Sequence, residues 1–259
     1  MFFKIDFVKA YDYLSWDFLL YMLEVLGFGN KWISWFKACL FSARFSVLVN
    51  GSPTDEFSIQ RGLRQSHPMA PFLFIIAMEG LHVAINNLVR NGLFCGVQIK
   101  QVMISHLFYV DDVIVAGEWS QSNLTNISNA LRYFYGISGL KINFQKSSII
   151  GIGVLHVEVN QLASKIGCKA ESLPFKYLGI PIGRNSKWIS FWEPVISKFK
   201  KRLLGWKANL LSIGGRLTLI KSVLSSLGNY YLSIFRMPKL LLILLNRLDP
   251  LSLVLALRV

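Results

Sequence analysis

The chain has 259 residues, of which 53% are hydrophobic and 14% aromatic, so it can bury a sizeable core and is not disordered throughout. Its 28 lysines and arginines against 14 acidic residues give a net charge of +14, which indicates a polyanionic partner, with a solvated basic surface as the alternative. Three scattered cysteines exclude a disulfide framework and a zinc site and indicate a reducing compartment.

The N-terminal segment "MFFKIDFVKAYD" acquires acidic residues before any long apolar run, so no signal peptide is expected. Within it, "FFKID" predicts a short strand that ends at Asp6. A helix is expected after Ser15 as N-cap, with Gly27 ending it. A second helix is expected over "NKWISWFKACLF", and "RFSVLVNGSPTDEFSIQ" predicts a hairpin that turns at Asn50-Gly51.

The segment "PFLFIIAMEGLHVAINNLV" predicts a long buried helix. Residues 102–116 predict a strand, a turn at Asp111 and Asp112, and a return strand. A helix from about Ser120 to Tyr135 follows, and "SGLKINFQKSSIIGIG" predicts a turn and another strand. Strands that alternate with helices and hairpins indicate an α+β fold, with a mainly antiparallel sheet packed on helices.

The composition changes after "YLGIPIG", residues 177–183. Residues 187–237 are helical in pattern and rich in lysine and arginine, so we place a domain boundary near residue 184, between domains 1–184 and 185–259. The tail "LLLILLNRLDPLSLVLALRV" is interrupted by polar residues and a proline, so neither a membrane-spanning helix nor stable membrane association is expected. That tail alone suggests another alternative, a basic amphipathic protein at a membrane surface.

Two adjacent carboxylates in a hairpin turn, Asp111 and Asp112, repel each other unless water or a cation relieves the repulsion. Mg²⁺ suits this position because it prefers hard oxygen ligands and often uses one or two carboxylates together with substrate phosphates. Asp6, at another strand end, would add a third carboxylate, and the three could hold two Mg²⁺ ions for phosphoryl transfer. An ordinary turn is the alternative, because aspartate is a good turn former.

Five segments follow one another in the order of the palm motifs of reverse transcriptases: "KIDFVKAYD", "IQRGLRQSHPMAPFLF", "HLFYVDDV", "SGLKINFQKS" and "FKYLGIPIG". Over roughly residues 2–237 the chain resembles the reverse transcriptases of plant non-LTR (LINE-type) retrotransposons. The resemblance implies a palm and a helical thumb-like segment, with the fingers largely missing because the chain begins almost at the first motif. It also implies synthesis of DNA from deoxynucleotides on an RNA template and a DNA primer.

The same resemblance implies two Mg²⁺ ions as cofactors, with Mn²⁺ as the alternative ion. An intracellular, nuclear location would follow if the chain works as a retroelement enzyme, and the sequence does not fix the oligomeric state. Asp6 and Asp111 match the family's catalytic metal-binding aspartates, and Asp112 matches the adjacent aspartate, whose metal contact is weaker. Tyr11 matches an aromatic residue that excludes a ribose 2′-hydroxyl, with ordinary packing as the alternative.

Further positions come from the later motifs. Gln65 matches the glutamine beside the incoming nucleotide and the template base. By the same resemblance Arg64 would contact phosphate, with a solvated loop cation as the alternative. Lys141 or Lys146 would neutralise or protonate the leaving pyrophosphate, with a solvated surface charge as the alternative for Lys146. The expected primer and template contacts come from the last motif and the basic helix beyond it: Tyr177, Leu178, Lys200, Lys201 and Arg202.

The chain departs from the family pattern after Gln65, where "RQSHPMAP" stands in place of "RQGDPLSP". Ser66 replaces a glycine that could take a positive φ, and it would strain the loop or obstruct binding. His67 replaces a carboxylate and would break any ion pair that this carboxylate made. The alternative function is therefore a degenerate remnant without catalysis, which binds nucleic acid in a salt-sensitive way through its basic surface.

Overall fold

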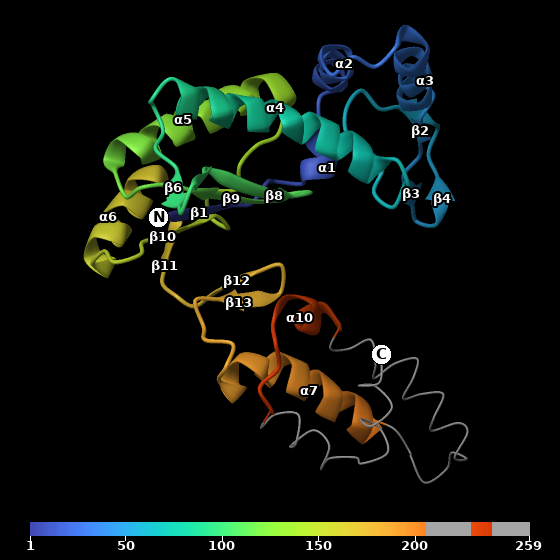
Figure 1. The fold of residues 1–259 in the computed structure, drawn as a ribbon. Helices are drawn as coiled ribbons and strands as arrows, with labels where there is room; N and C mark the ends of the chain where they lie inside the picture. The colour runs from blue at the N-terminus through green and yellow to red at the C-terminus, as the bar shows by residue number, and fades with distance from the viewer. Residues whose placement is uncertain (206–228, 240–259) are drawn as a thin grey trace. The chain divides into compact units, whose positions relative to one another are not determined.

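The computed structural model of the chain describes residues 1–205 and 229–239 (Figure 1). The chain divides into two compact units, Met1–Ser172 and Leu173–Val259. The segment "FKYLGIPIG" groups with the second unit, whereas the sequence places a boundary after it. The functional domains 1–184 and 185–259 stay a prediction, because compact units need not coincide with functional domains.

The first unit contains the following helices and strands: β1 (Phe2–Ile5), α1 (Ala10–Tyr13), α2 (Trp16–Val25), α3 (Asn30–Phe41), β2 (Arg44–Phe45), β3 (Leu48–Val49), β4 (Ser52–Pro53), β5 (Phe57–Ser58), α4 (Ala70–Arg90), β6 (Val97–Ile99), β7 (Val102–Ile104), β8 (His106–Tyr109), β9 (Asp112–Ala116), α5 (Gln121–Ser138), β10 (Ser148–Ile150), α6 (His156–Ile166) and β11 (Lys169–Glu171). Five strands form one sheet in the order β11-β10-β1-β9-β8. Its pairs are antiparallel except β10 with β11, so the expected α+β fold with a mainly antiparallel sheet is confirmed.

The central strand β1 has one apolar and one polar face, because side chains alternate along a strand. Phe3 and Ile5 are buried, whereas Lys4 between them and Asp6 beyond them are half-buried. Helices α4 and α5 lie across one side of the sheet (Figure 1). The apolar face of β1 thus packs into the core, and Asp6 continues the polar face that carries Lys4.

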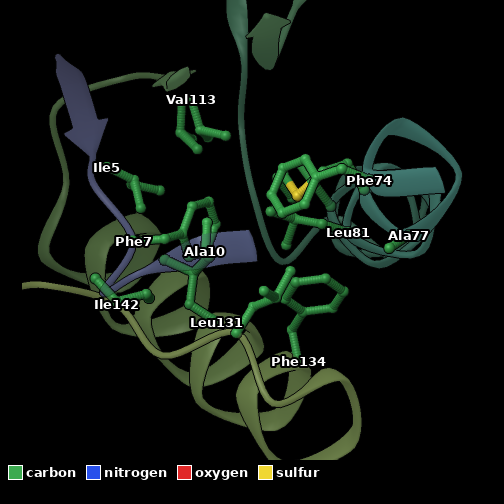
Figure 2. Close-up of a cluster of buried hydrophobic side chains, with 14 of the residues drawn as sticks. Ile5, Phe7, Ala10, Phe74, Ala77, Leu81, Val113, Leu131, Phe134 and Ile142 are labelled. Carbon is green, nitrogen blue, oxygen red and sulfur yellow. The ribbon is translucent and has the colours of Figure 1, made fainter. Parts of the chain in front are cut away.

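The core of the first unit lies between the sheet and the helices. Figure 2 shows side chains from β1, α4, β9 and α5 meeting there, among them Ile5, Phe74, Ala77, Leu81, Val113, Leu131 and Phe134. Within residues 1–205 and 229–239 one helix, α4, is long and apolar enough to cross a membrane by length and composition alone. That finding is weak evidence, because the core helix of a soluble protein passes the same test, and α4 buries seven of its residues.

Several local predictions are confirmed. Ser15 caps α2, accepting a hydrogen bond at its Oγ from the Phe18 N–H at 3.3 Å, and α3 spans the predicted twelve residues. Asn50 and Gly51 join β3 to β4 with φ of 50° and 85°, as a tight hairpin requires.

Two parts of the sheet differ from the prediction. The predicted strand, aspartate turn and return strand are confirmed by the antiparallel pairing of β8 with β9, but the first strand is shorter than expected, because Val102–Ile104 forms a separate strand, β7, that pairs with β6. Helix α6 and the parallel strand β11 were not foreseen.

The second unit contains β12 (Phe175–Tyr177), β13 (Ile180–Ile182), α7 (Ile189–Gly205) and α10 (Asn229–Ile234). β12 and β13 form an antiparallel hairpin. The Tyr231 hydroxyl donates to the Gly179 carbonyl at 2.7 Å, and Trp192 is fully buried, so α7, α10 and the hairpin share a small core. The apolar tail 240–259 and part of the basic region 185–259 lie outside the described residues.

Candidate active site

The pairing of β1 with β9 brings two carboxylate positions together. Asp6 follows β1 directly, and Asp112 is the first residue of β9. Ile5 pairs with Val113 in this antiparallel ladder, so continuing the register by one residue sets Asp6 opposite Asp112. Asp111 precedes Asp112 in the β8–β9 turn and is exposed. The backbone positions of the three aspartates therefore lie at the same end of the sheet, although more than a hundred residues separate the first from the others.

The turn that carries Asp111 has an unusual backbone. Tyr109 of β8 pairs with Asp112 of β9, which leaves only Val110 and Asp111 in the loop. Val110 has a φ of 55°, a left-handed conformation that a β-branched residue rarely adopts. Such strain costs about 1–3 kcal/mol and collects at functional sites. The paired residues of β8 and β9 on either side of the turn hold Val110 in this conformation, which places the backbone of Asp111 at the tip of the hairpin.

The aspartates share one electrostatic environment. Burial raises the pKa of the half-buried Asp112 carboxyl above its ordinary value, and the charge of Asp111 raises it further. Lys4 lowers this pKa, and Asp6 raises it. The sequence reasoning missed Lys4, although its position two residues before Asp6 on the polar face of β1 is the signal that could have found it.

Carboxylate oxygens are the ligands that Mg²⁺ and Mn²⁺ prefer, so this donor set fits such ions. As the side chains stand, no three His, Cys, Asp or Glu residues of the part of the chain that the structure describes are grouped to hold a metal. The fit therefore rests on the converging strand ends and the coupled charges.

Tyr11 lies on α1 beside the aspartates. Its ring stacks on Phe74 of α4, with centroids 4.8 Å apart and an interplanar angle of 22°. The pKa of its hydroxyl is raised, first by burial and then by the charge of Asp111. Tyr11 thus packs against the core and also interacts with the aspartate turn, so its packing role is compatible with a role at the site.

The segment that carries Gln65 is attached to α1. The Leu63 N–H donates to the Tyr11 carbonyl at 2.6 Å. Gln65 Nε2 donates to Asp12 Oδ1 at 3.3 Å, a contact that no sequence signal indicated. Arg64 lies between them in the chain and is exposed. The loop and α1 therefore form one assembly, which links Gln65 to the helix that carries Tyr11.

Lys141 lies on the segment that continues the sheet beside Asp6. The Val8 N–H donates to the Lys141 carbonyl, and the Asn143 N–H donates to the Asp6 carbonyl, both at 2.8 Å. Lys141 itself is exposed. The backbone of Lys141 is thus held two residues before Asn143, whose N–H bonds the Asp6 carbonyl.

Ser147 fixes the backbone of Asp6, and its removal should destabilise the chain. The fully buried Ser147 Oγ accepts from the Asp6 N–H at 3.1 Å and donates to the Asn143 carbonyl at 2.8 Å. Ser147→Ala leaves the Asp6 N–H without its acceptor and should lower the free energy of unfolding in urea by about 1–3 kcal/mol.

Ser128→Ala is the matched control. Ser128 is buried on α5, but its hydroxyl has no hydrogen-bond partner, so its loss should be neutral or slightly stabilising. Equal effects of the two substitutions would contradict this role of Ser147.

The remaining predicted residues belong to the second unit. Tyr177 ends β12, and Leu178 follows in the turn of the hairpin with a φ of 48°. Lys200, Lys201 and Arg202 lie on α7, where Lys201 is exposed; the side chains of the other two lie outside the described residues. Contacts of these residues with primer and template stay predictions.

A family model described as reverse transcriptase (RNA-dependent DNA polymerase) matches residues 1–182. The "Transposon TX1 uncharacterized 149 kDa protein" of Xenopus laevis is 28% identical over 234 residues, which cover 87% of this chain and 17% of that protein. A "Retrovirus-related Pol polyprotein from type-1 retrotransposable element R2" of Popillia japonica is 25% identical over 150 residues, 58% of this chain and 20% of that protein. The chain therefore spans a fifth or less of the length of these relatives.

Telomerase from Candida albicans, solved with a fragment of telomeric RNA, has a similar fold. The match has a TM-score of 0.51 and 14% identity and covers 98% of this chain and 44% of that chain. At this identity the likeness concerns the fold alone. It agrees with a palm-like α+β architecture.

Proposed function

The chain belongs to the reverse transcriptase (RNA-dependent DNA polymerase) family, and we propose that it is the palm and thumb-like part of the reverse transcriptase of a non-LTR, LINE-type retrotransposon. In this proposal it extends a DNA primer with deoxynucleotides on an RNA template. We also propose a plant origin for this reverse transcriptase, which is supported by the resemblance of the five motif sequences to plant LINE-type elements. The observation that carries the proposal is the β1–β9 register, which sets Asp6 opposite Asp112 beside Asp111.

The three aspartates act as the ligand set for divalent cations, two Mg²⁺ or alternatively Mn²⁺. When bound, such a pair of ions supplies charge neutralisation at the attacking primer hydroxyl and at the departing pyrophosphate. The protein itself holds the carboxylates on a strained, well-supported turn and keeps the strand ends together. Positioning and charge stabilisation account for most of phosphoryl-transfer catalysis, so little covalent chemistry is required of the side chains.

Other residues position the nucleotide and the primer. Tyr11, fixed by its stacking on Phe74, excludes a ribose 2′-hydroxyl by overlap. Gln65, held on Asp12, lies beside the incoming nucleotide and the template base. Arg64 contacts phosphate and Lys141 protonates or neutralises the leaving group. Primer and template contacts come from the second unit, through Tyr177, Leu178, Lys200, Lys201 and Arg202.

Primer extension on an RNA template tests this proposal. The chain should incorporate deoxynucleotides in the presence of Mg²⁺, and the double variant Asp111→Asn, Asp112→Asn should not. Equal incorporation by both proteins would rule out the role of the aspartates.

A second candidate function, nucleic-acid binding without catalysis, is favoured by one observation. Ser66 has a φ of 67°, the left-handed conformation that the glycine of the family motif would adopt without strain. This strain lies next to Gln65 and disfavours a productive loop. RNA binding that weakens with salt but is the same for the chain and the double variant, without extension by either, would support this function instead.

A further inference from the structure

Two histidines connect helix α4 to the strand that leads to the aspartate turn. His82 Nδ1 on α4 lies 2.7 Å from Nε2 of His106, the first residue of β8. The other nitrogen of each ring is also bonded. Asn86 Nδ2 lies 2.7 Å from His82 Nε2, and Ser105 Oγ lies 2.8 Å from His106 Nδ1. The four side chains form one continuous hydrogen-bonded chain between helix and strand.

The donors in this chain fix where the protons are. The Asn86 Nδ2 amine can only donate, so His82 Nε2 must accept. The proton of a neutral His82 is then on Nδ1 and is donated to His106 Nε2. The proton of His106 is consequently on Nδ1 and is donated to Ser105 Oγ. When both rings are neutral, each is therefore the Nδ1–H tautomer, and a proton added to His106 Nε2 would set two N–H groups against each other.

Apart from His82 and Ser105, the contacts that the described residues make with His106 are apolar or aromatic. Its antiparallel partner on β9 is the buried Val115, and the ring of Phe108 lies 4.7 Å from its own. On α4, His82 contacts the His106 ring, and the half-buried Glu79 lies one turn before His82. Burial first, and the charge of His82 second, lower the pKa of His106 from 6.5 to about 4.

We propose that the His82–His106 pair is a proton-sensitive clamp that positions β8, and with it the Asp111–Asp112 turn, against helix α4. The helix begins five residues after Gln65, so the clamp ties together two parts of the candidate site. The clamp does not depend on the proposed function, whereas its effect on polymerisation does.

The direction of the pH effect follows from the two states of His106. When β8 separates from α4, the ring regains its ordinary affinity for protons, with a pKa near 6.5, whereas the bonded ring has a lower pKa. The clamp is therefore fully closed above pH 6.5. It weakens as the pH falls from 6.5 towards 4, because protons bind preferentially to the open form.

Histidine-selective ¹⁵N NMR tests the proton arrangement in the unaltered chain. His67 and His156 provide the reference signals, since they complete the four histidines. At pH 7.5, His82 and His106 should both appear as neutral Nδ1–H tautomers. A charged ring, or an Nε2–H tautomer at either position, would overturn the assignment. Signals are assigned with the variants His82→Asn and His106→Gln.

Hydrogen exchange across the β8–β9 ladder tests the clamp itself. Between pH 7.5 and pH 5, protection corrected for intrinsic exchange should fall on the order of tenfold, while the β1–β10 ladder stays unchanged. His106→Gln keeps an acceptor for His82 Nδ1–H but cannot titrate, so its β8–β9 protection should not change with pH. His156→Gln removes an exposed histidine and should behave as the parent chain.

Two results would overturn the clamp: constant β8–β9 protection in the parent chain, or an equal fall in His106→Gln. Neither the NMR nor the hydrogen-exchange measurement needs primer extension. A chain without primer extension would therefore contradict the proposed function, while these two measurements would still test the clamp.

Discussion

Replacing Asp111 with asparagine is expected to lower Mg²⁺-dependent primer extension by about a thousandfold or more, equivalent to about 4 kcal/mol of transition-state stabilisation. Asparagine preserves the size of the side chain but removes the charge that holds a divalent cation. Asp111 is exposed at the tip of the hairpin, so the folded structure should tolerate the change. Single-turnover extension on an RNA template measures the loss.

Two further variants sharpen this test. Asp6→Asn should cause a comparable loss, because the register brings Asp6 to the same end of the sheet. Asp55→Asn removes an exposed carboxylate between β4 and β5 and should leave extension unchanged. Extension by Asp111→Asn within tenfold of the parent chain would contradict the catalytic role.

Replacing Gly62 with alanine should destabilise the chain by about 3 kcal/mol and reduce extension with it. Gly62 has a φ of 86°, and a Cβ added there would lie 2.5 Å from the carbonyl oxygen of Asp12. The backbone cannot move away easily, because the Gly62 N–H donates to Leu14 and its carbonyl accepts from Trp16 Nε1 at 2.7 Å. The contact lies between the Gln65 loop and α1. Urea denaturation measures the change in free energy.

Gly136 supplies the opposite case. It lies in α5 with an ordinary φ, and a Cβ added there would meet no atom within 4 Å. Gly136→Ala should therefore raise the free energy of unfolding by about 0.5–1 kcal/mol, because alanine favours a helix over glycine. If Gly62→Ala proved as stable as the parent chain, the close approach of the loop to α1 would be wrong.

Local sequence patterns were enough to place many elements. The Oγ of Ser15 marks the start of α2, and the positive φ angles at Asn50 and Gly51 suit a tight hairpin. These features depend on residues within one or two turns of each other, so they are readable without the fold. The local patterns did not predict which strands pair with each other. β7 pairs with β6, and β11 pairs with β10 across α6. Such choices depend on packing over long separations, which local periodicity does not contain.

The candidate site shows the same division. The resemblance to palm motifs named Asp6, Asp111 and Asp112, but only the register of β1 with β9 brings them to one place. The bond from Gln65 to Asp12 and the pairing of His82 with His106 join residues more than twenty positions apart. Each is a side-chain contact between separate elements, for which neither spacing nor composition provides a signal.

The most direct test of the account is the titration of the Asp112 carboxyl by ¹³C NMR in the parent chain and in Asp6→Asn. Burial and the charges of Asp111 and Asp6 raise the pKa of Asp112. We predict a raised pKa in the parent chain and a lower one in Asp6→Asn, because a neighbouring like charge is removed. An Asp112 pKa that is the same in both proteins would contradict the convergence of Asp6 with the aspartate turn.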